Sequence, residues 1–248
     1  MYFNLLATLI ILICIAISLF GNLAGFGGGV FVVPILVAFF NYPFSTAVGA
    51  TVFSLVIASL ISTYFNKKEG SIDFKTGIVL EIPTMIGAVL GSLLLDYVPL
   101  VPIEIIFAVL LFLLSYSFLK SKKNYTSSTG KETGTLKKLN ALPPVIHIYN
   151  KELNVHYNIG LWLATFFGLL SGSLAGLFGV GGGFMKTPIM IKVFKIPVKI
   201  ATSTAMFMIV ITSITSAISH YTQGHIIIVY TWPVVMGFII GALLSGLI

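Results

Sequence analysis

Long apolar runs separated by short polar segments limit what this chain can fold into more than any other feature. The runs cover residues 3–20, 30–40, 47–65, 78–95, 103–119, 159–178, 184–194, 201–218 and 226–248. Most of them approach the roughly 20 residues that an α-helix needs to cross the hydrocarbon core of a bilayer. The pattern predicts an all-α polytopic membrane protein, surrounded by the lipid bilayer.

The amino-acid composition supports this class and excludes others. Of 248 residues, 57% are hydrophobic and 8% are charged, whereas about 25% of a typical soluble domain is charged. So few charges cannot cover the surface of a soluble enzyme, a DNA-binding domain or a disordered scaffold. All fourteen positive side chains are lysines, and the chain therefore lacks the arginine forks that suit bidentate recognition of phosphates and bases. Nucleic acid is not an expected partner.

The chain contains an internal duplication. From Gly25 onward, a shift of 154 residues without a gap superposes Gly25 on Gly179 and brings two triple glycines into register. The further aligned pairs are Pro34 with Pro188, Pro43 with Pro197, and Gly70 with Gly224. Apolar residues match by chance easily, but glycines and prolines in register do not. The sequence therefore predicts two related transmembrane units.

Three segments follow from this duplication. Residues 1–119 form the first transmembrane repeat, residues 120–157 a cytoplasmic loop, and residues 158–248 the second transmembrane repeat. Within the loop, residues 121–138 are rich in Lys, Ser, Thr and Gly, which predicts a mobile segment. Alternating apolar residues at 145–149 and 153–157 around a polar turn predict a short β-hairpin outside the membrane. The run at 103–119 has no partner in the second repeat, so we expect that this span was lost or that the sequence is truncated after Ile248.

The lysines indicate how the two repeats are oriented. If each triple-glycine element is a hairpin that enters and leaves on one side, segments 66–75, 120–157 and 192–199 share one side of the membrane. That side then holds thirteen of the fourteen lysines, as the positive-inside rule requires of the cytoplasmic side. Four simple crossings in each half would instead place segment 192–199 opposite the others. The charge pattern favours two inverted repeats in the inner or plasma membrane, with the N-terminus outside.

The triple glycines are the strongest candidates for a binding site. Gly27, Gly28 and Gly29 in the first repeat, and Gly181, Gly182 and Gly183 in the second, each precede an apolar run of only 11 residues that contains a proline. Such a run is about 17 Å long as a helix, too short to span a bilayer. We expect a broken helix whose new N-terminus attracts an anion, and two inverted copies would aim two such ends at one site. The alternative is that the glycines only allow close helix packing.

Two charged residues fall inside apolar elements. Lys186 follows the second triple glycine and could attract an anionic substrate, or else extend to the membrane interface. Glu81 lies inside the run at 78–95 and could carry a coupling proton, or else pair with a lysine such as Lys75 near the interface. The hydroxyls of Thr51, Ser203 and Thr204 are further candidates for contacts with an oxyanion, although hydroxyls in membrane helices often bond to backbone carbonyls.

Other kinds of chemistry find little support. His220 and His225 lie five residues apart without a neighbouring carboxylate or cysteine in the sequence, which is a weak metal signal. No arrangement of Ser, His and Asp or of Cys and His suggests a catalytic centre. We therefore expect no enzyme activity, no metal and no cofactor.

The duplicated motif resembles a known family. The pattern G-x-x-A-G-F-G-G-G-x-x-x-x-P ends at Pro34, and G-x-x-A-G-x-x-G-V-G-G-G-x-x-x-x-P ends at Pro188; the blocks Pro43–Ala47 and Pro197–Ala201 follow. The two glycine patterns and the two Pro–Ala blocks are similar to motifs of the TauE/SafE sulfite exporter family of permeases. The resemblance implies secondary transport of sulfur-containing anions such as sulfite, thiosulfate or organosulfonates, with proton coupling in at least some members. The residues after the alanines, Gly49-Ala50-Thr51 and Ser203-Thr204-Ala205, depart from the Gly-Thr-Ser that the family often has.

The sequence therefore predicts an anion transporter that works by alternating access. Its expected partners are a small anionic substrate, protons and the lipid bilayer, and self-association into a homo-oligomer stays open. A membrane subunit or assembly factor that recruits a partner through the central loop is the alternative from a different class. The identity of the anion, the direction of transport and the coupling ion do not follow from the sequence.

Overall fold

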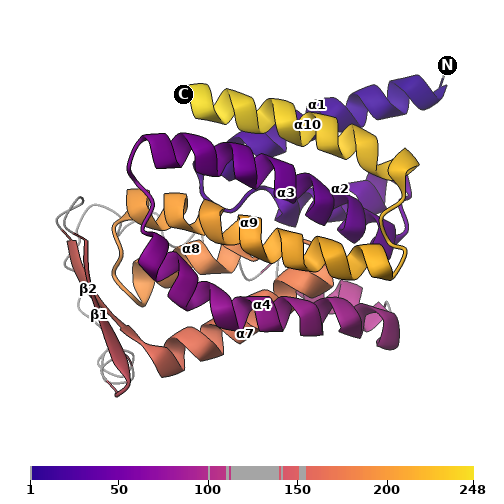
Figure 1. The fold of residues 1–248 in the computed structure, drawn as a ribbon. Coiled ribbons are helices and arrows are strands. Elements are labelled where there is room, and N and C mark those ends of the chain that lie inside the picture. Colours follow the sequence, from indigo (N-terminus) through magenta and orange to yellow (C-terminus); the bar gives the residue numbers. More distant parts are fainter. Residues whose placement is uncertain (1, 100, 110–111, 113–139, 141, 151–154) are drawn as a thin grey trace.

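The computed structural model describes residues 2–99, 101–109, 112, 140, 142–150 and 155–248. Its helices are α1 (Tyr2–Leu23), α2 (Gly29–Phe40), α3 (Phe44–Lys68), α4 (Phe74–Tyr97), α7 (Leu161–Phe178), α8 (Gly183–Lys192), α9 (Val198–Thr222) and α10 (Ile228–Leu247) (Figure 1). Residues 101–109 are also helical. Within the described residues, six helices are long and apolar enough to cross a membrane: α1, α3, α4, α7, α9 and α10. The prediction of an all-α polytopic membrane protein is confirmed.

The predicted β-hairpin is present. Strands β1 (Val145–Asn150) and β2 (Val155–Gly160) pair antiparallel, with Ile148 opposite Tyr157 and Ile146 opposite Ile159. Alternation places Ile148, Tyr157 and Ile159 in a buried cluster that also contains residues of α4, α7, α8 and α9. The lysine-rich segment 121–138 and the turn between the strands lie outside the described residues.

The helices of the two halves correspond at the shift found in the sequence. Adding 154 to the bounds of α3 gives 198–222, which are the bounds of α9. Backbone conformations correspond as well: Asn41 and Lys195 are the two non-glycine residues with positive φ in the described chain, and they lie 154 residues apart. The same local sequence signals therefore produce the same sequence of helix, break, short helix and long helix twice.

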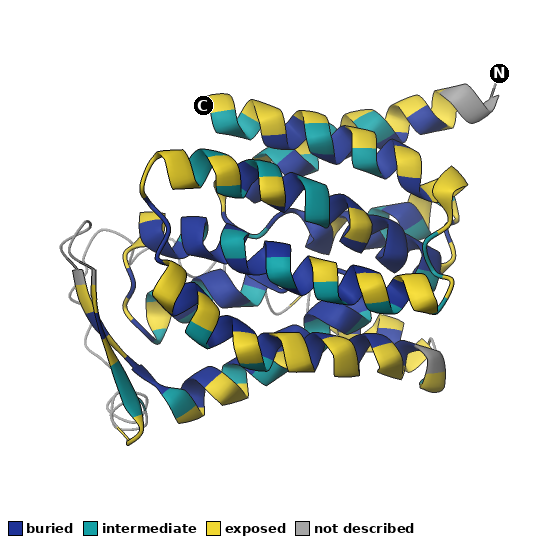
Figure 2. Ribbon diagram, in the orientation of Figure 1, coloured by how far each residue is buried: buried dark blue, intermediate teal, exposed yellow. Residues whose placement is uncertain are grey.

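Each repeat packs its first helix against the fourth helix of the other repeat, α7 against α4 and α1 against α10. A β-carbon on Gly168 of α7 would lie 2.7 Å from the Pro83 ring of α4, and one on Gly237 of α10 would lie 2.4 Å from Cβ of Cys14 in α1. These two contacts are the same pair after the shift of 154. Helices α3 and α9 occupy the centre and are more buried than the other four spans (Figure 2). The two repeats therefore interlock in one bundle.

The central helices α3 and α9 run antiparallel. Ser71, shortly after α3, donates to Ser203 near the start of α9 (2.8 Å), whereas Gly49, near the start of α3, lies against the carbonyl of His225 after α9. We name the first of these ends the lysine end: it consists of residues 66–75 and 192–199 and the β-hairpin. Among the described lysines, all except Lys186 lie there. Residues 41–45 and 219–227 lie at the opposite end.

The glycine elements enter the bundle from different ends. Helix α1 runs parallel to α10, since Cys14 meets Gly237 and Ser18 meets Gly241. Helix α2 returns to the starting end of α10, where the Tyr42 hydroxyl donates to the carbonyl of Tyr230 (3.1 Å). Helices α7 and α8 form the corresponding pair at the lysine end (Figure 1). Both pairs turn in the interior of the bundle.

Candidate functional site

Left-handed glycines produce the two interior turns. Gly27 and Gly28 have φ of 76° and 89°, and Gly181 and Gly182 have φ of 68° and 70°. Residues with a side chain rarely adopt this conformation, whereas glycine does so without steric cost. Gly28 and Gly182 also stand at the N-caps of α2 and α8, and neither helix start has a side-chain cap. The chain thus breaks and restarts a helix at the positions where the sequence predicted it.

The two turns meet in the interior. The Thr187 hydroxyl of α8 donates to the carbonyl of Gly25 (2.7 Å). A β-carbon on Gly29 would lie 3.1 Å from the carbonyl oxygen of Gly179, and one on Gly183 would lie 2.8 Å from Cα of Phe26. Close backbone approach therefore requires glycine at these positions.

Apolar side chains fill the space beside the turns. Leu55 of α3 and Ile209 of α9, which correspond at the shift of 154, both lie against Gly27 and Gly181. Both side chains are fully buried. In this conformation the turns are packed against the central helices, and an anion between them would require these two side chains to move.

A buried ion pair lies next to the second turn. The Lys186 ammonium of α8 is 2.8 Å from the Glu81 carboxylate of α4, and the two side chains are 2% and 1% exposed. The hydroxyl of Thr212 in α9 contacts both charged groups. Three helices therefore converge on one charged cluster inside an apolar bundle. Lys186 is buried instead of extending outward, and Glu81 pairs with Lys186 instead of Lys75.

This cluster occurs in only one half of the molecule. The positions that correspond to Lys186, Glu81 and Thr212 at the shift of 154 are Val32, Val235 and Ala58. A buried charge without a partner is costly, and the mutual attraction of two charges offsets that cost only when their geometry is good. The pair is therefore a specific addition to a scaffold that folds without it in the other half.

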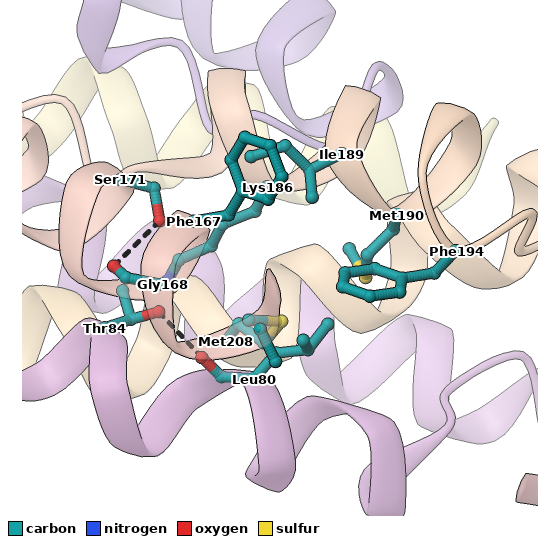
Figure 3. A pocket seen from close by; sticks show the side chains of 11 residues that line it. Leu80, Thr84, Phe167, Gly168, Ser171, Lys186, Ile189, Met190, Phe194 and Met208 are labelled. Atoms are coloured by element: carbon teal, nitrogen blue, oxygen red, sulfur yellow. Dashed lines mark hydrogen bonds between the residues drawn. The ribbon is translucent and has the colours of Figure 1, made fainter. Parts of the chain in front are cut away.

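A small cavity adjoins Lys186. Its volume is about 20 Å³, and Leu80, Thr84, Phe167, Ser171 and Met190 are among its lining residues (Figure 3). The Thr84 and Ser171 hydroxyls donate to the carbonyls of Leu80 and Gly168, at 2.8 and 3.1 Å. A cavity of this size has room for about one water molecule. The charged pair is thus almost completely enclosed by protein.

The three candidate hydroxyls lie in two different places. Thr51 donates to the carbonyl of Ala47 (2.8 Å) and turns its methyl group toward Gly29. Ser203 accepts from Ser71 (2.8 Å), and Thr204 accepts from the backbone N–H of Asp73 (3.0 Å). Thr51 is therefore beside the glycine turns, whereas Ser203 and Thr204 hold the loop at the lysine end. The structure does not bring these three hydroxyls together.

Sequence reasoning did not single out two polar residues that the structure places near the turns, Thr187 and Asn22, and it ranked Thr212 below Thr51, Ser203 and Thr204 among the hydroxyls that follow the short helices. Thr187 follows Lys186 directly, so its place in the short helix after the triple glycine was a usable signal. Thr212 is 131 residues from Glu81, and only the packing of α4 on α9 brings them together. Asn22 is the second-last residue of α1, shortly before the first glycine turn, and is 7% exposed.

The β-hairpin is attached to α4 through a polar network. Asp73 caps α4 by accepting from the backbone N–H groups of Lys75 and Thr76. The Tyr157 hydroxyl contacts the Asp73 carboxylate and lies 2.9 Å from the Thr76 hydroxyl. Burial, together with the adjacent Asp73 carboxylate, raises the pKa of the Tyr157 phenol. The hairpin is therefore held by a neutral tyrosine.

Comparison with known proteins agrees with the resemblance found in the sequence. The family model for the sulfite exporter TauE/SafE matches residues 10–248. The chain is 28% identical over 236 residues to "Probable membrane transporter protein YunE" of Bacillus subtilis (strain 168), which covers 92% of this chain and 83% of that protein. It is also 28% identical over 228 residues to "Probable membrane transporter protein MJ0441" of Methanocaldococcus jannaschii, which covers 90% of this chain and 75% of that protein. No solved structure shows a significant match. Because the family model covers nearly all of its length, the chain belongs to the sulfite exporter TauE/SafE family and is a multi-pass membrane transporter.

Proposed function

We propose that this protein is a secondary transporter that moves small sulfur-containing anions, such as sulfite, thiosulfate or an organosulfonate, across the cell membrane. The observation that carries the proposal is the buried Lys186–Glu81 pair beside the second glycine turn. A cation held in the interior of a membrane protein is the group that an anion needs on its path. The description of the matched family as a sulfite exporter and the relatives' names as membrane transporters support the same reading.

The pairing of these charges supports a coupling of transport to protons. In the structure the Glu81 carboxylate neutralises Lys186. A proton bound to Glu81 would leave the ammonium without a counter-charge, and a substrate anion could then take the place of the carboxylate. Loss of the anion would favour return of the proton to water and re-formation of the pair. One proton and one anion would therefore move together.

Alternating access would use the two repeats. We propose that they are inverted relative to the bilayer, with the lysine end in the cytoplasm and the N-terminus outside. The antiparallel packing of α3 on α9 and the placement of the described lysines support this orientation. A movement of one repeat against the other would open the path toward the glycine turns from one end at a time.

Transport in proteoliposomes tests the proposal. Purified protein should exchange radiolabelled sulfite against internal sulfite, and an inward proton gradient should drive its accumulation. Glu81→Gln should abolish gradient-driven accumulation but keep exchange, because a neutral side chain cannot release a proton. Glu104→Gln, which changes an exposed carboxylate outside this cluster, serves as the matched control. Gradient-driven accumulation by the Glu81→Gln variant would remove Glu81 from the coupling mechanism, and the absence of any exchange by the unmodified protein would contradict sulfite transport.

A further inference from the structure

The β-hairpin packs onto the apolar cluster that lies in front of Lys186 at the lysine end. Ile148 of β1 and Tyr157 of β2 belong to this buried cluster, together with Met190 and Phe194. The side chains of Met190 and Phe194 also line the small cavity that adjoins Lys186 (Figure 3). The hairpin, the cluster and the cavity therefore form one continuous series from the lysine end to the buried ion pair.

The direction of the helices shows that the cavity lies between Lys186 and the lysine end. Helices α4 and α7 begin at this end, and α8 ends there. The cavity is lined by Leu80 and Ala164, near the starts of α4 and α7, and by Phe194, just after α8. Lys186 stands near the interior start of α8. A solute that approached Lys186 along these helices from the lysine end would have to pass beneath the hairpin.

The hairpin is fixed at its base and held over the cluster by one polar side chain. At the base, the backbone N–H of Leu161 donates to the carbonyl of Pro144, directly before β1 (3.0 Å). Nearer the turn, the Tyr157 hydroxyl contacts the Asp73 carboxylate and the Thr76 hydroxyl. Within the described residues, Tyr157 alone hydrogen-bonds the two strands to α4 and its cap. Release of this side chain would free the hairpin while its base stays attached to α7.

The described part of the other repeat has a helix where this repeat has the second strand. At the shift of 154, β2 corresponds to residues 1–6, and residues 2–6 belong to α1. The buried ion pair is also specific to one place, because Lys186 and Glu81 correspond to Val32 and Val235. The pseudo-symmetry is therefore broken by a strand and by a charged pair, and both lie along the same path. A hairpin that only connected the repeats would not need to cover the charged cluster.

We propose that the β-hairpin is a lid that closes the path from the lysine end to Lys186 and Glu81, and that it opens when Tyr157 leaves Asp73. The inference rests on the proposed transport function, because it assigns a gate to that same site. In the structure the lid is closed, and its apolar side chains cover the cluster. Opening would lift these side chains away and would let water and an anion reach the cavity beside Lys186.

The reaction of a cysteine placed in the cavity measures opening of the lid. Met190→Cys, in a Cys14→Ala background, puts a thiol at a fully buried lining position. The purified full chain in detergent is treated with 2-sulfonatoethyl methanethiosulfonate, a small charged reagent that reaches the thiol from water. Tyr157→Phe should raise the rate of labelling about tenfold, because it removes a hydrogen bond to a carboxylate that holds the lid closed. If Met190→Cys does not fold, Met208→Cys provides a second lining position.

A second variant tests the same contact from the other side. Asp73→Asn keeps an oxygen that can cap α4, but its amide NH₂ cannot accept a hydrogen bond from the Tyr157 hydroxyl. It should therefore accelerate labelling of the cavity cysteine in the same direction as Tyr157→Phe. An unchanged labelling rate in both variants would overturn the lid.

Two controls distinguish the lid from a general loosening of the protein. Tyr149→Phe also removes a hydroxyl from the hairpin, but Tyr149 is in the exposed part of β1, so the labelling rate should stay unchanged. Ser216→Cys places the thiol in α9 toward the opposite end, at a position that is 1% exposed and does not line the cavity. Its labelling should not respond to Tyr157→Phe. Equal acceleration at Ser216→Cys and Met190→Cys would contradict the lid.

Sulfite exchange by the same preparations in proteoliposomes separates this inference from the proposed function. Faster labelling of the cavity in Tyr157→Phe, with no exchange by the unmodified protein, would support the lid and contradict sulfite transport. Exchange by the unmodified protein, with the same labelling rate in all variants, would support transport and overturn the lid.

Discussion

Lys186 and Glu81 are held by each other and by Thr212. The cost of removing two charges from water is offset here by a direct contact of 2.8 Å and by the shared hydroxyl. Removing only one partner of such a pair typically costs about 3–5 kcal/mol, because the other charge stays buried without compensation. The proposed transport role of these residues is therefore linked to their effect on stability, and experiments on them need a control for folding.

Lys186→Gln should raise the apparent KM for sulfite by more than about tenfold, equivalent to about 1.4 kcal/mol. A charge acting in an enclosed interior is poorly screened, so its loss is felt more strongly than that of a surface lysine. The measurement is sulfite exchange in proteoliposomes over a range of concentrations.

The double variant Glu81→Gln/Lys186→Gln controls for folding in this experiment. It removes both charges together, so it should unfold at a higher temperature than Lys186→Gln alone. An unchanged KM in a folded Lys186→Gln protein would reduce the pair to a structural role.

The glycine turns allow a second prediction at the scale of residues. Gly28→Val and Gly182→Val should abolish transport. A β-carbon at Gly28 would lie 2.8 Å from the carbonyl oxygen of Ile17, and one at Gly182 would lie 3.2 Å from Cβ of Ala175. Both positions also have positive φ. Insertion into the membrane should persist, and fractionation with immunoblotting measures it alongside sulfite exchange.

Gly70 and Gly224 provide the matched controls for backbone strain. They also have positive φ and also correspond at the shift of 154, but a β-carbon at either position would meet nothing within 4 Å. Gly70→Val and Gly224→Val should therefore retain transport with a modest loss of stability. If all four variants behave alike, strain alone explains the effect and the interior turns have no special role.

At the scale of elements, the β-hairpin depends on the contact between Tyr157 and Asp73. Tyr157→Phe should loosen the hairpin from α4, because it removes the hydroxyl that contacts Asp73 and Thr76. Faster cleavage of the hairpin by an added protease measures this change. Tyr149→Phe, in the exposed part of β1, should leave the cleavage rate unchanged.

The same contact should depend on pH in a defined direction. The pKa of Tyr157 is raised in the folded protein above its usual value of about 10. Its contribution to stability is therefore complete below pH about 10 and is lost as the pH rises through the folded pKa. Protection of the hairpin against the protease should fall in that alkaline range in the unmodified protein. A Tyr157→Phe protein with the same pH dependence would show that another group is responsible.

At the scale of the whole molecule, the arrangement of the ends predicts a topology. Single cysteines at Asn66 and Lys195, in a Cys14→Ala background, should react only with reagents that reach the cytoplasm. Cysteines at Asn41 and Gln223 should react from outside. Asn124, outside the described residues, should report the cytoplasm as well. Labelling of Lys195 and Asn66 from different sides would contradict the inverted arrangement, because both lie at the lysine end.

The sequence by itself determined the class and the local structure of this protein. Apolar runs of bilayer length predict helices because unpaired backbone groups are not tolerated in lipid. The triple glycines predict breaks because glycine adopts the left-handed conformation found at Gly28 and Gly182 without the steric cost that a side chain adds. The alternation that predicted the hairpin is likewise a local property. Each of these signals depends on a few neighbouring residues, so it can be recognised from the sequence alone.

Only the tertiary structure decided which residues meet. Lys186 and Glu81 are 105 residues apart, and nothing in either apolar run identifies the other as its partner. Ser203 and Thr204 looked equivalent to Thr51 in the sequence, but the packing of α9 places them at the lysine end and Thr51 beside the glycine turns. The cavity lined by Asn22 and Ser62 likewise depends on how four helices pack. In an apolar bundle many helix faces can pack against one another, and the polar contacts form only after that choice has been made.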